Sequence, residues 1–170
     1  MAAVTAAFDI EEYLAHPLVC RIATAGPMVL PVWFLWEGGL FWILTGPWSR
    51  LPEAIDANPA VALVVDTCDL GSGKTLQVVA SGLAELVAFD VERGRRLLGR
   101  YLGPDVDAWD PRFRDYLGLR SGSAAGTKWA RVRPDRLAAR DLSFRASRPT
   151  TSDSSLRNST GTGQTFLPRR

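Results

Sequence analysis

Histidine and cysteine are scarce in this chain of 170 residues, which has one histidine and two cysteines. Cys20 and Cys68 lack the spacing of a zinc-ligand pair, and His16 does not complete a site with them. We therefore expect no metal site. Both cysteines lie in or beside apolar, strand-like runs, and we expect them to pack as small buried apolar side chains.

Long apolar runs are also missing. The longest uncharged run, residues 22–36, contains two prolines and is shorter than the roughly 20 residues that span a bilayer. The N-terminus has neither a basic leader nor a cleavage signature, so we predict no signal peptide and a cytoplasmic location.

Lysine is the third scarce residue, because 18 of the 20 basic residues are arginine. Residues 1–88 carry 3 basic and 9 acidic side chains, and residues 89–170 carry 17 and 9. Arginine suits bidentate recognition of phosphate or carboxylate, although the base composition of the gene can produce the same excess. Arg93, Arg95, Arg96 and Arg100 share a predicted helix and are expected to form a solvated face. With only Tyr101 nearby, we predict no nucleic-acid binding.

What is present indicates a folded, mainly β chain, with 46% hydrophobic and 22% charged residues. Apolar runs bounded by turn residues predict strands over 18–24, 28–36, 40–45, 60–67 and 76–89, and two closing strands within 126–144. Short helices are expected after Asp9, near Ser49, after Asp90 and around residues 110–118. This pattern predicts a six- or seven-stranded antiparallel, barrel-like sheet in one domain, 1–146, followed by a polar tail, 147–170.

The stretch GSGKT, residues 71–75, resembles the end of a phosphate-binding loop. The opening glycine of that motif would fall at position 68, which holds Cys68. The stretch also joins two predicted strands, whereas a phosphate-binding loop joins a strand to a helix. We interpret it as a hairpin loop, with Lys74 in solvent. Gly82, in the second strand, indicates a bulge or a close backbone approach.

A better anion site is predicted at LTGPWSRLPEAI. Thr45 ends a strand and Ser49 and Arg50 begin a helix, so two hydroxyls, a guanidinium and free amides would converge. The alternative is that Ser49 only caps the helix and Arg50 is solvated. Aromatic residues crowd around this loop at positions 33, 36, 41, 42 and 48. They fit either core packing or the walls of a site for a planar, phosphorylated ring.

Read in order, RIAT, PVWFLWEGGLFWILTGPWSR, NPAVALVVD, QVVASGLAEL and KWARVRPDRL resemble the pyridoxamine 5′-phosphate oxidase-like family of split β-barrel flavoproteins. The resemblance covers roughly residues 9–144. It implies a split barrel with short flanking helices, and a homodimer that binds FMN, or the deazaflavin coenzyme F420, at the subunit interface.

The resemblance also implies the cofactor-binding residues. One strand would flank the ring, the segment around Thr45 would hold the phosphate, and two later strands would complete the site; the implied residues are Pro31, Val32, Trp33, Phe34, Thr45, Ser49, Arg50, Gln77, Trp129 and Arg131. The family commonly reads Ser-Arg-Lys where this chain has Leu51 after Arg50, which predicts weaker phosphate binding or a cation supplied from elsewhere.

The function implied is hydride transfer between the coenzyme and a small organic substrate. Because the coenzyme carries that chemistry, no catalytic triad is required. His16 and Glu37 are interpreted as a helix-end residue and a solvated turn residue. Two alternatives stay open: a split barrel that binds a flavin or haem without turnover, and an interaction domain whose basic half recruits an acidic partner.

Overall fold

A computed structural model of the chain describes residues 3–26, 28–117 and 126–145. The predicted tail, 147–170, lies outside these residues. The strands are β1 (Ala3–Ala6), β2 (Cys20–Thr24), β3 (Met28–Val32), β4 (Phe34–Glu37), β5 (Leu40–Thr45), β6 (Ala60–Asp69), β7 (Lys74–Ala88) and β8 (Lys128–Asp141). The helices are α1 (Ile10–Leu14), α2 (Leu51–Ala57), α3 (Val91–Leu102), a short 3-10 helix η1 (Val106–Ala108) and α4 (Pro111–Tyr116).

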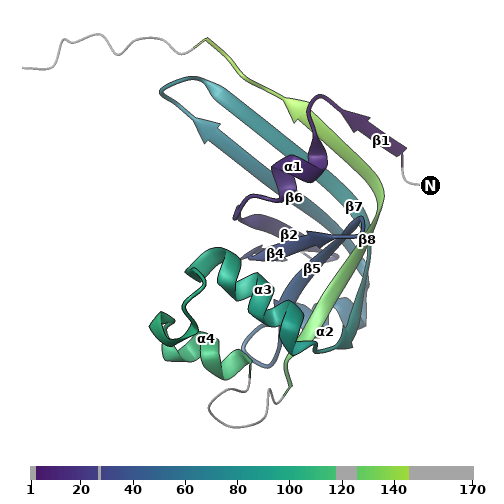
Figure 1. The fold of residues 1–170 in the computed structure, drawn as a ribbon. Coiled ribbons are helices and arrows are strands. Elements are labelled where there is room, and N and C mark those ends of the chain that lie inside the picture. Colours follow the sequence, from purple (N-terminus) through teal and green to yellow (C-terminus); the bar gives the residue numbers. More distant parts are fainter. Residues whose placement is uncertain (1–2, 27, 118–125, 146–170) are drawn as a thin grey trace, which may run out of the picture.

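All eight strands belong to one curled sheet (Figure 1), in the order β3-β2-β6-β7-β8-β5-β4. These seven strands pair antiparallel, and β1 joins parallel to β8. The predicted mainly β, split-barrel fold is therefore confirmed. The sequence analysis did not predict β1, because four residues are too few to show a strand pattern.

The two edges of the sheet are consecutive in the chain. Strands β3 and β4 lie at opposite ends of the strand order, and Trp33 is the single residue between them. The strand predicted over 28–36 is thus two strands. Since one residue spans only about 3.5 Å, the sheet must curl until its two edges meet at Trp33.

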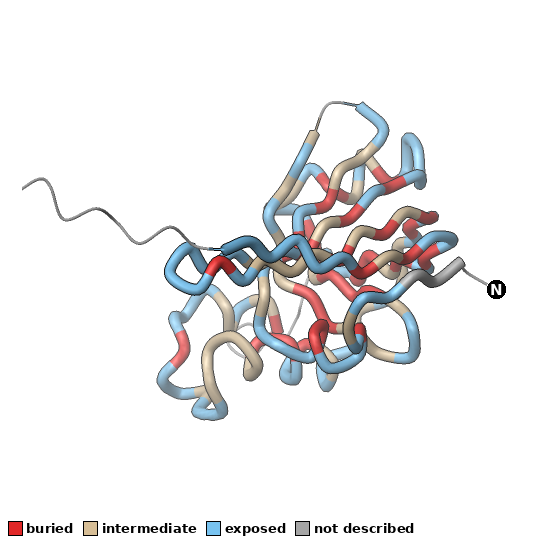
Figure 2. Tube along the Cα trace, turned by 90° about the horizontal axis from the view of Figure 1, so that it is seen from above, coloured by how far each residue is buried: buried red, intermediate tan, exposed pale blue. Residues whose placement is uncertain are grey.

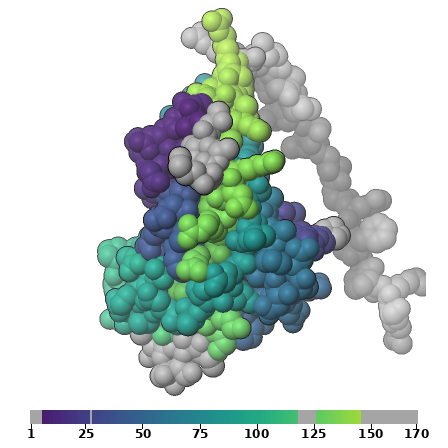
Figure 3. Space-filling model, turned by 90° about the vertical axis from the view of Figure 1, so that its right-hand side faces the viewer, coloured from purple at the N-terminus to yellow at the C-terminus, as the bar shows by residue number. Residues whose placement is uncertain are grey.

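Strand β8 holds the curled sheet together along its length. It pairs with β7 from residue 128 to 141, with β5 through residues 128–132 and with β1 through residues 136–139. The two closing strands expected from the sequence are therefore one strand. In Figure 3 the N-terminal residues, in purple, lie beside this yellow-green strand.

The GSGKT stretch lies in a hairpin, as predicted, because it connects β6 to β7. The Asp69 carboxylate accepts hydrogen bonds from the Gly71 amide at 2.9 Å and the Ser72 hydroxyl at 2.6 Å. Gly73 closes the turn with a φ of 75°, a left-handed conformation that favours glycine. Lys74 is already the first residue of β7.

The core lies inside the curl, where buried residues of the strands and of α1 and α2 meet (Figure 2). Helix α1 begins as predicted, since the Asp9 carboxylate accepts a hydrogen bond from the Glu12 amide at 3.0 Å. Cys20 is fully buried, and this burial raises the pKa of its thiol to about 12. Cys68 is exposed. The expectation that it is buried was wrong, because it points outward near the end of β6.

A bulge interrupts the β7–β8 ladder at Gly82, the position predicted for one. The register shifts between Ser81 and Gly82, and Gly82 faces Pro134. A Cβ atom on Gly82 would lie 2.1 Å from the Arg133 carbonyl oxygen. The bulge accommodates a proline, which has no N–H to donate, in a strand that is central in the sheet.

Gly82→Ala is predicted to lower the free energy of unfolding by about 3 kcal/mol, because the clash is with backbone and not with a movable side chain. Urea denaturation monitored by tryptophan fluorescence measures the change. Gly99→Ala in α3 is the matched control: its Cβ would meet only Trp109, at 3.9 Å. There we expect a gain of about 0.5–1 kcal/mol. Equal effects of the two substitutions would contradict the role given to Gly82.

Candidate functional site

A cavity of about 350 Å³ lies at the seam where the sheet closes; we call it the aromatic cavity. The β3–β4 junction forms one wall, the β5–α2 segment a second, and helices α3 and α4 a third. Its lining residues are Leu30, Pro31, Val32, Trp33, Leu44, Trp48, Ser49, Leu51, Leu97, Leu98, Phe113 and Tyr116. Among the described residues of this lining, Ser49 and Tyr116 are the two with a side-chain hydroxyl, so the cavity suits a flat, largely apolar group.

Two aromatic stacks shape the cavity. The Trp33 ring lies between Tyr101 and Phe113, with ring centroids 4.7 and 5.2 Å apart. Trp48 stacks on Tyr116 at 4.2 Å and remains 45% exposed. Each stacked pair contributes about 1 kcal/mol beyond the area that it buries. The stacks therefore hold Trp33 and Trp48 in fixed orientations on two sides of the same hollow.

Gly46 makes the Trp48 orientation possible, because a Cβ atom at this position would lie 2.4 Å from the Trp48 ring. Trp48 belongs to the turn between β5 and α2, as the sequence indicated. Its exposed ring is available to a ligand, whereas Trp42 and Trp129 are buried.

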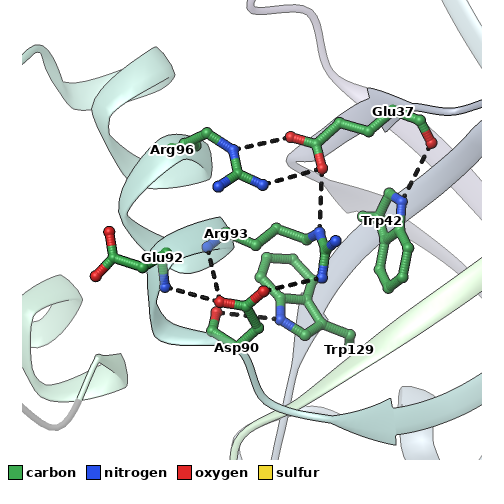
Figure 4. Close-up of polar contacts among 7 residues, drawn as sticks. All are labelled: Glu37, Trp42, Asp90, Glu92, Arg93, Arg96 and Trp129. Carbon is green, nitrogen blue, oxygen red and sulfur yellow. Dashed lines mark hydrogen bonds and ion pairs between the residues drawn. The ribbon is translucent and has the colours of Figure 1, made fainter.

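Helix α3 carries one wall of the cavity and is fastened to the sheet by charged residues at its start (Figure 4). The Glu37 carboxylate, at the end of β4, accepts hydrogen bonds from Arg93 Nε at 3.1 Å and from Arg96 Nε at 3.0 Å. The Arg93 guanidinium also lies 3.7 Å from the centre of the Trp42 ring. The predictions that Glu37 is a solvated turn residue and that Arg93 belongs to a solvated face were therefore wrong, and Arg100 is partly buried as well. Arg95 and Arg96 are exposed, as predicted, although Arg96 also binds Glu37.

The charges of this cluster are mutually stabilised. The pKa of Glu37 is lowered, mainly by the hydrogen bond from Arg96. Burial opposes this shift to a smaller extent, and the hydrogen bond from Arg93 adds to it. The Asp90 carboxylate caps α3 by accepting from the Glu92 and Arg93 amides, and the Arg93 bond lowers the pKa of Asp90. The Trp129 indole donates to the Asp90 carbonyl at 3.4 Å.

A second fastening lies at the other end of α3. The Tyr101 hydroxyl donates to the Leu18 carbonyl at 2.7 Å, and it accepts from the Phe34 amide at 3.3 Å. Arg100 donates to the carbonyls of Leu14 and His16, and burial lowers the pKa of its guanidinium. Tyr101 therefore fixes the β3–β4 junction through hydrogen bonds as well as through its stack on Trp33.

Glu37→Gln is predicted to lower the free energy of unfolding at pH 7 by about 1 kcal/mol, because the carboxylate is one-third exposed and Arg96 half-exposed. The folded-state pKa of Glu37 is lowered, so its contribution is present above the unfolded pKa and is lost as pH falls through the folded value. The stability difference between the two proteins should therefore shrink below about pH 4.5.

Denaturation curves between pH 3 and 7 measure this difference. Glu92→Gln is the control: it changes a 72% exposed carboxylate on the same helix, whose ion pair with Arg95 spans 3.6 Å. A Glu37→Gln difference that stays constant over this pH range would contradict the assignment.

Four of the ten predicted cofactor-binding residues line the aromatic cavity: Pro31, Val32, Trp33 and Ser49. Three others are buried. Phe34 packs in the main core, Trp129 packs with Trp42 beneath α3, and the Thr45 hydroxyl has no hydrogen-bond partner among the described residues. Arg131 pairs with Glu85. Gln77 lies opposite Asp66 and Arg140 in the ladder, outside the cavity lining.

Thr45, Ser49 and Arg50 were expected to converge on one site, but the structure places them apart. Helix α2 begins at Leu51 with Arg50 as its N-cap, and the Ser49 hydroxyl accepts from the Leu51 amide at 3.1 Å. Ser49 and Leu51 line the aromatic cavity. Arg50 lines a neighbouring cavity of about 400 Å³ with Glu53 and the β2–β3 turn. The Ser49–Leu51 turn therefore has one cavity on each side.

Sequence analysis missed the wall formed by Leu97, Leu98, Phe113 and Tyr116. The sequence did contain a signal for this wall, namely the apolar spacing of α3 and the aromatic pair in α4. Such spacing indicates that one side of a helix is buried, but it does not indicate which part of the protein packs against that side. Among the described residues, no three His, Cys, Asp or Glu side chains are grouped as metal ligands. No helix in the described ranges has the length and apolarity to cross a bilayer.

A curled antiparallel sheet with a cavity at its seam defines a split β-barrel protein. The family model described as pyridoxamine 5′-phosphate oxidase matches residues 9–138, and the chain belongs to this family. No curated protein matches the chain.

Solved structures give the same fold. An F420 reductase is 28% identical, with a TM-score of 0.54, over 75% of this chain and 94% of that one. The flavocytochrome Anf3 from Azotobacter vinelandii is 16% identical, with a TM-score of 0.60, over 96% and 82%. The conserved hypothetical protein Rv2991 from Mycobacterium tuberculosis is 20% identical, with a TM-score of 0.60, over 78% and 82%. The last two are similar in fold alone.

Proposed function

We propose that this protein is an oxidoreductase that binds a flavin-type coenzyme, FMN or F420, and transfers a hydride between it and a small organic substrate. The observation that carries the proposal is the aromatic cavity, which lies at the barrel seam of a chain in this family. The F420 reductase, at 28% identity, supports it. When bound, the coenzyme supplies the redox chemistry, and the chain supplies position and surroundings.

The residues present fit the ring of such a coenzyme. Trp48 offers an exposed aromatic face that is held by its stack on Tyr116, and Trp33, whose faces are covered by Tyr101 and Phe113, adds the edge of its ring to the lining. Pro31, Leu44 and Leu97 add apolar surface that excludes water from the ring. The Ser49 hydroxyl accepts one hydrogen bond and has its own proton left to donate.

The phosphate of the coenzyme would lie outside the ring cavity. Leu51 is buried where the family commonly has lysine, and no lysine or arginine of the described residues belongs to the aromatic lining. Arg50 is the cation nearest along the chain, on the other side of the Ser49–Leu51 turn. We propose that the ring occupies the aromatic cavity while the phosphate reaches Arg50.

We also propose a homodimer, with the coenzyme near the contact between copies. The convex side of β2, β3, β6 and β7 presents small apolar side chains: Ala23, Val29, Ala62, Val64 and Val79. Val29 is 62% exposed. The paired Arg21 and Asp66 lie on the same face, so a second copy would bury a mostly apolar surface together with one ion pair. Pro31 belongs to this face and to the cavity lining, so the two surfaces are adjacent.

The alternative is a split barrel that carries the coenzyme without turning it over. The buried Leu51 favours it, because weaker phosphate binding suits a site that has lost selection for catalysis. A bound coenzyme that small organic donors do not reduce and small organic acceptors do not reoxidise would support this alternative.

Trp48→Leu is predicted to raise the dissociation constant of the coenzyme about tenfold, because an exposed ring that stacks on the flavin is lost. Titration of the purified protein with FMN and with F420, followed by tryptophan quenching, measures it. Leu83→Ala, which changes a 57% exposed side chain on β7, is the control and should leave the constant unchanged. Binding of neither coenzyme by the unaltered protein would sink the proposed function.

Arg50→Ala is predicted to weaken FMN binding about tenfold and to leave riboflavin binding unchanged, since riboflavin has the same ring and no phosphate. Calorimetric titration with both ligands measures this. Arg140→Ala removes an exposed arginine from β8 and serves as the control. An equal loss for FMN and riboflavin would show that Arg50 does not bind the phosphate.

A further inference from the structure

A third cavity, of about 440 Å³, lies between α1 and the projecting part of the β6–β7 hairpin; we call it the arm cavity. Figure 1 shows α1 packed against this projecting part of the sheet. The lining residues are Phe8, Asp9, Glu12, Tyr13, His16, Leu18, Thr67, Lys74 and Leu76. None of them lines the aromatic cavity, so the arm cavity is a separate site.

The floor of the arm cavity is apolar and well fixed. Phe8 and Tyr13 meet edge to face, with ring centroids 5.0 Å apart, and Leu18 and Leu76 complete it. The Tyr13 hydroxyl lies 3.3 Å from the Thr67 hydroxyl and 3.2 Å from the Leu76 carbonyl. These bonds join α1 to the hairpin and burial raises the pKa of Tyr13. The floor therefore persists as one surface.

Two of the polar groups around this floor have local partners. The Asp9 carboxylate caps α1. His16 Nδ1 lies 3.0 Å from the Glu12 carbonyl, which leaves only its second ring nitrogen for a ligand.

The remaining charged groups belong to two different elements that line the cavity. Among the described residues, neither the Glu12 carboxylate on α1 nor the Lys74 ammonium on β7 has an ion-pair partner within 4 Å. The Asp141 carboxylate interacts with the charge of Lys74 over a longer distance, but its hydrogen bonds come from Ser143. One anion and one cation without an ion-pair partner thus belong to the same lining as the apolar floor.

We propose that the arm cavity binds a small zwitterion with an apolar side chain, such as a free α-amino acid. Its ammonium group pairs with Glu12, its carboxylate pairs with Lys74, and its side chain covers the apolar floor. A simple amine pairs with Glu12 but places its positive charge near Lys74. A simple acid pairs with Lys74 but places its negative charge near Glu12. The only charged residue of the GSGKT stretch thereby acquires a ligand-binding role.

The probes are L-phenylalanine, phenethylamine, which lacks the carboxylate, and 3-phenylpropionate, which lacks the amine; L-leucine tests a second side chain. Calorimetric titration of the full chain at pH 7 should show that one of the two amino acids binds at least tenfold more tightly than the amine or the acid. Glu12→Gln should abolish the preference over the acid. Lys74→Met should abolish the preference over the amine.

Lys74→Arg keeps the charge and should retain the preference, which separates charge recognition from a general effect on the hairpin. Lys128→Met and Glu92→Gln are the matched controls, since they remove the other lysine and an unrelated exposed carboxylate. Both positions tested are exposed, so unchanged thermal midpoints will verify folding.

The proposal is overturned if neither amino acid binds at 10 mM, if the amine and the acid bind as well as the amino acids, or if Lys74→Met leaves every affinity unchanged. Coenzyme binding is measured in the same variants and should not change. Failure of the arm cavity is therefore distinguishable from failure of the proposed oxidoreductase function.

Discussion

The closure of the sheet through Trp33 is the constraint on which the rest of the structure depends. Because one residue connects the two edge strands, the edges meet and leave a seam. The side chain of this residue, Trp33, lies in the seam. A seam of this kind needs a cover, which α3 and α4 provide. The charged cluster around Glu37 and the hydrogen bonds of Tyr101 keep α3 in place. The cavity is thus a by-product of closure that the helices enclose.

Much of the fold was predictable from local sequence signals. Alternation, turn residues and caps depend on neighbours a few positions apart, and the strands, the hairpin at GSGKT and the Asp9 cap were predicted from them. Gly82 was recognised for the same reason, since glycine within an apolar strand indicates a backbone contact. The order of the motifs then carried the family resemblance, although no single motif did.

The rest depends on contacts between distant residues, which local patterns do not contain. Glu37 lies in a turn before two glycines, and only its approach to Arg93, 56 positions later, makes it a helix anchor. Ser49 and Arg50 are adjacent in the sequence, yet the helix start at Leu51 turns them towards different cavities. The β1–β8 pair is invisible for the same reason, because residue 3 meets residue 136.

That last pairing has a consequence for the order in which the chain folds. The hairpins β2–β3, β4–β5 and β6–β7 close short loops, so their entropic cost is small and they can form early. Strand β8 can align only on a surface that these hairpins have already assembled. Strand β1 has β8 as its sole partner among the described strands, so it adds last. The first strand of the chain is thus the final one to join the sheet, and we expect its amides to exchange with solvent fastest.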